Sequence, residues 1–189
     1  MSAPPRLRKA ARVMGKSLLF RDAGPDDAAF ILSLRTDPEK SRYLSATPAD
    51  VAAQRAWLAS YAAADDQAYF IIEHEAARIG TVRLYDAREH SFCWGSWILQ
   101  NGRPQHAAME SALMVYAFAL DHLGFTAAHF DVRKGNERVW QFHERFGAAR
   151  VGETELDYLY CLEQAEISES RRRYAKFLPH GVTVVWPTS

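Results

Sequence analysis

The chain has 189 residues, and its 23 Lys and Arg residues balance its 23 Asp and Glu residues, so its formal net charge at pH 7 is +0. A balanced charge gives no general attraction to nucleic acid or to an anionic membrane, which favours a small-molecule or peptide partner. A chain of this length buries roughly 70% of the surface that its unfolded form exposes, which predicts one domain with a sizeable core.

The two cysteines and the ends of the chain indicate the compartment and the domain limits. Cys93 and Cys161 lack metal-site spacing and are typical of buried free thiols in a reducing, cytoplasmic compartment. The basic N-terminus lacks the apolar core of a secretory signal, and no later run is long enough to span a membrane. We predict a flexible tail over residues 1–16, one domain over 17–165, and a C-terminal helix and tail over 166–189. This last segment is expected to pack on the domain or on a second subunit, which would make a homodimer.

The first part of the chain predicts a strand over residues 17–22 and a helix over 25–35 that starts at a proline. A second helix start is expected at Thr47, where the pattern matches a capping box and Pro48 takes the first helical position. The residues of this helix that are expected to point inward are Val51, Trp57, Leu58 and Tyr61.

Three apolar runs separated by polar turns then predict an antiparallel meander, over Ala68–Glu73, Ile79–Asp86 and Ser91–Leu99. The period next changes to that of a long helix that ends at Gly124. Its apolar stripe consists of Met109, Ala112, Leu113, Tyr116, Ala117 and Leu120. A strand over 126–132, a helix over 136–146 and a strand region over 151–162 follow, then a short charged helix.

This order of elements predicts an α/β fold, with a mixed sheet and helices on both of its faces. The strand Ser91–Leu99 runs directly into a loop and the N-terminus of the long helix. Such a junction is where an open α/β sheet binds a phosphate-bearing ligand.

Four stretches of sequence also carry a family resemblance. They are Trp94–Ile98, Tyr116–Phe118, Leu123–Phe125 and Asn136–Ala148. In these stretches the chain resembles the GCN5-related N-acetyltransferase (GNAT) superfamily, which uses acetyl-CoA as acyl donor. The resemblance implies a GNAT-like mixed, mostly antiparallel central sheet with helices on both faces, and an acyl-CoA N-acyltransferase domain over residues 17–165.

Within the superfamily the chain is most similar to the branch with ribosomal-protein N-terminal acetyltransferases and bacterial amino-sugar N-acetyltransferases. Residues 34–43 and Asp157–Leu162 favour the amino-sugar enzymes of the pseudaminic acid type. The resemblance therefore implies an acetyltransferase that acts on the amine of an amino sugar, nucleotide-linked, in surface glycan biosynthesis. The alternatives are a protein N-terminal acetyltransferase and a non-catalytic acyl-CoA-binding or interaction domain.

The resemblance also implies a donor site. A backbone N–H of Ile98 or Leu99 would hold the thioester carbonyl. The other residues expected to bind acetyl-CoA are Gly102, Arg103, Gln105, His106, Ala107, Ala108, Asn136 and Phe142. The loop departs from the glycine-rich pattern of the family, since it has one glycine and also Pro104, which has no N–H to donate. The alternative role of Asn136 is a helix N-cap.

His143 stands where the family commonly has a tyrosine that protonates the departing thiolate. A histidine with an ordinary pKa of ~6.5 can donate a proton at neutral pH, so the substitution is chemically permitted. The alternative is a half-buried residue with a packing role. For the base, His106 and Glu110 are the candidates near the start of the long helix, and each is otherwise a first-turn polar residue.

The residues expected to contact the acceptor come from several elements. They are Arg35, Tyr43, Tyr85, Trp97 and Asp131. Alternation along the strand puts Asp131 and Arg133 on one face, where they could form an ion pair or bind an acceptor hydroxyl or phosphate. No metal site is expected.

Overall fold

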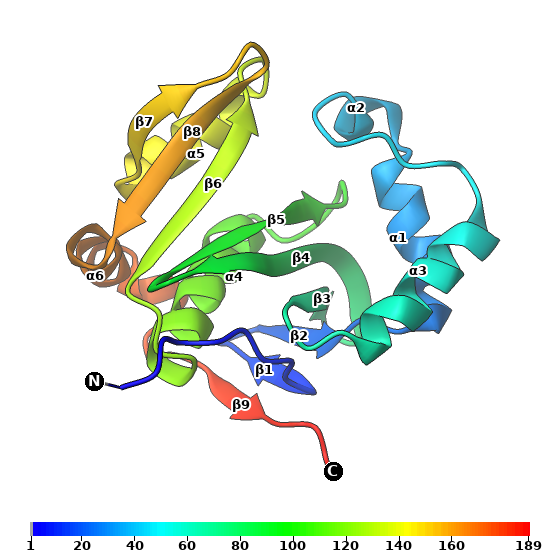
Figure 1. Ribbon diagram of the computed structural model, residues 1–189, viewed down its shortest axis with the longest axis horizontal. Coiled ribbons are helices and arrows are strands. Elements are labelled where there is room, and N and C mark those ends of the chain that lie inside the picture. Colours follow the sequence, from blue (N-terminus) through cyan, green and yellow to red (C-terminus); the bar gives the residue numbers. More distant parts are fainter. Residues whose placement is uncertain (1) are drawn as a thin grey trace.

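The computed structural model describes residues 2–189, and its central element is a nine-stranded sheet with the strand order β7-β8-β6-β5-β4-β3-β2-β1-β9 (Figure 1). Within the described residues, β5 and β6 form the one parallel pair. The strands are β1 (Arg12–Met14), β2 (Leu18–Asp22), β3 (Ala68–His74), β4 (Ala77–Arg88), β5 (Ser91–Leu99), β6 (Ala127–Arg133), β7 (Ala149–Glu153), β8 (Asp157–Glu163) and β9 (Thr183–Val185). The expected mixed, mostly antiparallel sheet is confirmed.

The helices cover both faces of this sheet. They are α1 (Ala28–Arg35), α2 (Pro38–Ser41), α3 (Val51–Ala63), α4 (Ala107–Ala117), α5 (Glu137–Phe146) and α6 (Gln164–Arg173). The expected long helix is α4 followed by a π-helical turn over Phe118–His122. No helix within residues 2–189 is long and apolar enough to cross a membrane.

Alternation along each strand separates two cores. Phe70 of β3 joins the larger core beneath α4, α5 and α6, whereas its neighbours Tyr69 and Ile71 join a smaller core beneath α1 and α3. Leu58 and Tyr61 of α3 are buried in this smaller core, as the sequence predicts. Both faces of the sheet are thus covered by helices. A ligand can enter the sheet only where two neighbouring strands stop pairing.

Strands β5 and β6 separate early. They pair through three residue pairs, and the last of these joins Cys93 to His129. Beyond this pair β5 stays beside β4 as far as Leu99, and β6 stays beside β8 as far as Arg133. The two strands diverge into an open wedge, as Figure 1 shows. Each therefore presents an unpaired strand edge to the wedge.

A β-bulge lies in the diverging part of β5. The register with β4 shifts between Thr81 and Arg83, so that Ser96 and Trp97 are inserted where one residue would normally pair. Ser96 adopts a φ of 46°, and its carbonyl accepts a hydrogen bond of 2.8 Å from the Thr81 hydroxyl. The extra residue brings Trp97 onto the same face as Trp94, with 5.2 Å between the ring centroids.

The prediction of a flexible tail over residues 1–16 is wrong for residues 7–16, and residue 1 lies outside the described residues. Strand β1 pairs with both β2 and β9, and the side chains of Leu7, Ala10 and Val13 are buried. A three-residue strand among basic residues leaves little alternation for a sequence pattern to reveal. Strand β9 pairs with β1 of the same chain, so the C-terminal tail packs on this domain.

The start of α3 also differs from the prediction. The helix begins at Val51, and the Asp50 carboxylate accepts two backbone N–H groups of its first turn. The Thr47 hydroxyl instead accepts a hydrogen bond of 2.7 Å from Nε of Arg35. Asp50 is itself a strong N-cap residue, so the cap moves three residues along the chain.

Candidate active site

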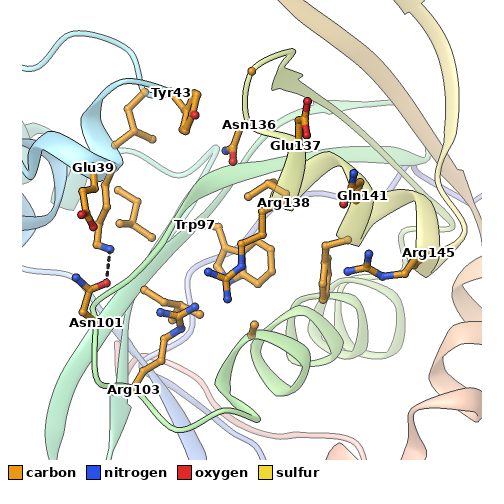
Figure 2. Close-up of a pocket in the computed structure, with 18 residues that line it drawn as sticks. Glu39, Tyr43, Trp97, Asn101, Arg103, Asn136, Glu137, Arg138, Gln141 and Arg145 are labelled. Atoms are coloured by element: carbon orange, nitrogen blue, oxygen red, sulfur yellow. Dashed lines mark hydrogen bonds between the residues drawn. The ribbon is translucent and has the colours of Figure 1, made fainter.

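A cavity of about 850 Å³ occupies the wedge between β5 and α5 (Figure 2). Its walls come from α2 and the loop after it, the end of β5 with its loop, the start of α4, and α5. The lining residues are Glu39, Lys40, Tyr43, Leu44, Trp97, Ile98, Leu99, Asn101, Arg103, Ala108, Gly135, Asn136, Glu137, Arg138, Val139, Gln141, Phe142 and Arg145. We call this the wedge cavity.

The edge of β5 gives this cavity backbone hydrogen-bonding groups. Gln100 donates its N–H to the carbonyl of Ile79 at 2.8 Å, so its backbone faces β4. Because backbone groups alternate sides along an antiparallel pair, those of Leu99 face the wedge. An extended ligand with amide groups can pair with such an edge as another strand would. Of Ile98 and Leu99, the alternation therefore selects Leu99 as the N–H available to a ligand.

The wedge cavity also carries cations without carboxylate partners. Arg103 comes from the loop and Arg138 from α5, and Figure 2 shows both side chains reaching into the cavity. Burial, and then the nearby Arg138, lower the pKa of Arg103. Within residues 2–189, Arg103, Arg138 and Arg145 form no ion pair. Guanidinium groups that lie close together and form no ion pair with a carboxylate favour an anion, phosphate above all.

The loop before α4 contributes less backbone than the sequence suggests. The helix begins at Ala107, and the Ala107 N–H already donates to the Pro104 carbonyl at 3.0 Å. Gly102 has a φ of 80°, a conformation that favours glycine, and so makes the turn. Of the six loop residues expected to bind the donor, Arg103 and Ala108 line the cavity, and the four that do not are Gly102, Gln105, His106 and Ala107.

Glu110 is a structural carboxylate rather than the base candidate that the sequence suggests. Its side chain is 1% exposed and accepts hydrogen bonds from the backbone N–H groups of Ser17 and Leu18, at 2.6 and 3.0 Å. The Ser17 hydroxyl donates to it as well, at 2.6 Å, and also bonds Nε2 of His106 at 2.7 Å. Glu110 and His106 thus fasten the start of β2 to α4, and neither lines the wedge cavity.

His143 lies in an aromatic cage beneath the wedge. The residue is 5% exposed, and its ring lies 4.3 Å from that of Phe130 and 5.3 Å from that of Trp94, centroid to centroid. Burial lowers the pKa of His143 to about 3. At pH 7 only about one ring in 10⁴ is then protonated, so the free protein holds no imidazolium to act as an acid. The neutral ring retains one N–H that can donate a hydrogen bond.

Asn136 and Phe142 both line the wedge cavity, as expected for donor-binding residues. Asn136 stands at the N-cap position of α5, but its side chain makes no capping hydrogen bond. Its amide is therefore free to contact a ligand.

The α5 helix is capped by Gly147, whose φ of 113° gives the left-handed conformation that glycine adopts readily.

A second cavity, of about 460 Å³, lies on the opposite face of the sheet, between β4 and the chain that joins α2 to α3. We call it the β4 cavity. Its lining residues are Arg35, Ser45, Ala46, Thr47, Pro48, Ala53, Gln54, Trp57, Tyr69, Arg83, Tyr85 and Ser96. These include two arginines and three large aromatic residues, and no carboxylate. The two cavities meet at the bulge, because Ser96 lines one and Trp97 the other.

Two residues of the β4 cavity were missed by the sequence analysis. The Arg83 guanidinium lies 4.6 Å from the ring centroid of Tyr85 and 5.3 Å from that of Trp57. Trp57, expected in the core, is 39% exposed and forms part of this wall. Alternation along β4 puts Arg83 and Tyr85 on one face and could have indicated the first of them.

The residues expected to bind the acceptor divide between the two cavities. Arg35 and Tyr85 line the β4 cavity, whereas Tyr43 and Trp97 line the wedge cavity. Arg35 is oriented by hydrogen bonds to the Thr47 and Ser45 hydroxyls, at 2.7 and 2.9 Å. Asp131 lines neither cavity.

Comparisons with known proteins identify the family of this domain. A family model described as the acetyltransferase (GNAT) domain matches residues 17–149. FdhC in its apo form, described as a nucleotide-linked sugar GNAT, is 34% identical, with 94% of this chain and 99% of that chain covered and a TM-score of 0.79. A comparison with curated proteins gave no match.

Two further solved structures show the fold alone. A GCN5-related N-acetyltransferase from Brucella melitensis is 16% identical, with 94% of this chain and 90% of that chain covered and a TM-score of 0.76. A spermidine N-acetyltransferase chimera, of SpeG from Vibrio cholerae and hSSAT, is 15% identical, with 81% and 99% covered and a TM-score of 0.66.

The structural role of Glu110 predicts a loss of stability without a loss of chemistry. Glu110→Gln exchanges a charged acceptor for a neutral one, and we expect the free energy of unfolding to fall by roughly 1–3 kcal/mol. In urea titrations the exposed Glu75→Gln control should stay within about 0.5 kcal/mol of the parent chain. If folded Glu110→Gln had unchanged stability and a turnover number lower by orders of magnitude, Glu110 would instead have a catalytic role.

The buried, neutral His143 predicts a loss of stability in acid. Its pKa is near 6.5 in the unfolded chain and about 3 in the folded protein, so between these values the unfolded state binds more protons. Stability should fall as the pH drops below 6.5, by up to about 1.4 kcal/mol per pH unit from this group. His143→Phe should flatten that slope in urea titrations between pH 7 and 4.5, and the exposed His180→Gln should not. Equal slopes for His143→Phe and the parent chain would contradict the account.

Proposed function

Since the chain belongs to the GNAT acetyltransferase family, whose domains use acetyl-CoA as acyl donor, we propose that it acetylates the amine of a nucleotide-linked amino sugar. The amine attacks the thioester carbon directly while both substrates are bound. Acetyl-CoA supplies an activated acetyl group, and the chain must bind it, orient it and present the amine.

The wedge cavity has the groups that acetyl-CoA needs. Its pantetheine arm is an extended chain with amide groups, which fits the unpaired edge of β5 at Leu99. Its phosphates fit the unpartnered guanidinium groups of Arg103 and Arg138. These side chains replace the backbone amides that a glycine-rich loop would otherwise supply. We assign to the N–H of the neutral His143 ring, which is buried beneath the wedge cavity and does not line it, the stabilisation of negative charge on the sulfur.

The composition of the β4 cavity carries the proposal for the acceptor. Two guanidinium groups without a carboxylate favour an anionic molecule, and the aromatic walls favour a flat ring or the apolar face of a sugar. A nucleotide-linked amino sugar has both features, and its amine would reach the bulge where the two cavities meet. The FdhC structure, described as a nucleotide-linked sugar GNAT, supports the same class of acceptor.

The alternative acceptor is a protein N-terminus. Its amine carries a positive charge before reaction, and the peptide continues as an uncharged backbone. A cavity with Arg35 and Arg83 and no carboxylate offers such a ligand repulsion rather than attraction. The sugar nucleotide is therefore favoured.

The proposal extends to the setting of the enzyme. We place the reaction in the cytoplasm, which agrees with two free cysteines, and assign its product to surface polysaccharide synthesis. A homodimer stays a prediction, because the C-terminal tail that suggested it pairs within its own chain.

The acceptor is tested by measuring thiol release from acetyl-CoA with two panels. One holds dTDP- and UDP-linked 3-amino and 4-amino 6-deoxy sugars, and the other holds short peptides with free N-termini. We expect turnover with the sugars. Arg83→Gln and Arg35→Gln should each raise the KM for the sugar by about 10- to 100-fold, the equivalent of one lost charge-assisted hydrogen bond, with little change in the KM for acetyl-CoA.

The exposed Arg173→Gln is the matched control and should retain both KM values. Turnover of peptides but not of sugars would overturn the proposed acceptor class. An unchanged sugar KM in both cavity variants would show that the sugar binds elsewhere.

A further inference from the structure

The separation of β5 and β6 interrupts the pairing of residues across these two strands. Tyr85, Cys93 and His129 are neighbours across β4, β5 and β6, on one face of the sheet. Two residues further along, the same face presents Gly95 on β5 and Asp131 on β6. A continuous parallel pair would join these two residues, but the strands have already diverged. Gly95 and Asp131 therefore face each other across the narrow end of the wedge.

Gly95 leaves room for the Tyr85 side chain on the side of the β4 cavity. A Cβ added at Gly95 would lie 2.9 Å from the Tyr85 hydroxyl, so this hydroxyl lies over Gly95 and next to the gap. Arg83 pairs with Gly95 in the β4–β5 register and lines the β4 cavity. Arg83 and Gly95 therefore lie on the face of the sheet on which Asp131 stands at the far side of the gap.

Asp131 has no cation of its own. The expected ion pair with Arg133 is not formed, because Nε of Arg133 lies 3.0 Å from the Asp157 carboxylate instead. No Lys, Arg or His within residues 2–189 forms an ion pair with Asp131, and its side chain is open to solvent. Burial of part of the group and the nearby Asp157 raise the pKa of Asp131. An unpartnered carboxylate with a raised pKa is suited to accept a proton.

The other titratable groups around Asp131 do not compete for this role. Burial raises the pKa of Tyr85, and it raises that of Cys93 to about 11, so both are neutral at pH 7. His129, on the same strand, is held by the Ser91 hydroxyl at 2.6 Å and lies 3.4 Å from Asp86. Asp157 is committed to Arg133. Asp131 is thus the carboxylate on this face that is free to meet an incoming ammonium.

We propose that Asp131 binds the ammonium group of the acceptor at the gap opposite Gly95 and acts as the general base of the reaction. This rests on the proposed function only in requiring an amine acceptor. Asp131 takes one proton from the ammonium and leaves a neutral amine. The nitrogen forms its bond to the acetyl carbon as the carbon–sulfur bond breaks and its electron pair leaves on sulfur. The second proton lost by the nitrogen passes through solvent to the thiolate, and Asp131 returns its own proton to solvent.

The test measures kcat and both KM values against pH for the parent chain, Asp131→Asn, Asp131→Glu and Asp157→Asn, with both the sugar and the peptide panels. Asp131→Asn should lower kcat by ~10²-fold or more and leave the KM for acetyl-CoA unchanged. Its rate should depend on the amine arriving already deprotonated, and so rise with pH across the whole range. Asp131→Glu should restore part of the activity.

Asp157→Asn removes a negative charge that raises the pKa of Asp131. The parent rate falls as the pH drops through that pKa, so this variant should move the acidic limb to lower pH. The exposed Glu155→Gln should behave as the parent chain does.

The outcomes separate this inference from the proposed function. Sugar turnover with an Asp131→Asn kcat within threefold of the parent would overturn the role of Asp131 and keep the acceptor class. Turnover of peptides alone, with Asp131→Asn impaired, would overturn the acceptor class and keep Asp131. No turnover of either panel by the parent chain would count against both.

Discussion

The separation of β5 from β6 after the pair of Cys93 and His129 is the constraint on which the rest of the site depends. It frees the β5 edge at Leu99, opens a cavity toward α5, and leaves Gly95 and Asp131 facing each other without a strand between them. In the proposed reaction, donor and acceptor approach one point from opposite faces of the sheet. A fully paired sheet would have neither the opening nor the free edge.

Such an opening would expose the larger core unless something filled the space beneath it. His143 does so, because its ring packs between Phe130 on one side of the wedge and Trp94 on the other. The Trp94 indole in turn donates to the buried Tyr116 hydroxyl at 3.1 Å, which fixes the rings on α4. This packing gives His143 a physical reason to be buried and neutral. A proposed role of His143 in catalysis therefore rests on one N–H hydrogen bond rather than on a transferred proton.

Local patterns predicted most of the elements, whereas contacts between distant segments decided the roles of several residues. Periodicity located the meander, α4 and α5, and the strand-to-helix junction indicated the wedge cavity. The same patterns could not show that the Glu110 carboxylate accepts a hydrogen bond from the backbone N–H of Ser17, which lies 93 residues away in the chain. They also could not show the bulge at Ser96. The bulge requires a φ of 46° at this serine, and residues other than glycine rarely adopt a positive φ. The β4 cavity, with Arg83 at its wall, exists only once α3 has packed against the sheet.

The most direct test of this account is a crystal structure of the chain with CoA bound. We expect the pantetheine arm beside the β5 edge at Leu99, the phosphates between Arg103 and Arg138, and the sulfur at the gap between Gly95 and Asp131. A CoA bound in the β4 cavity, or one whose sulfur lies outside that gap, would contradict it.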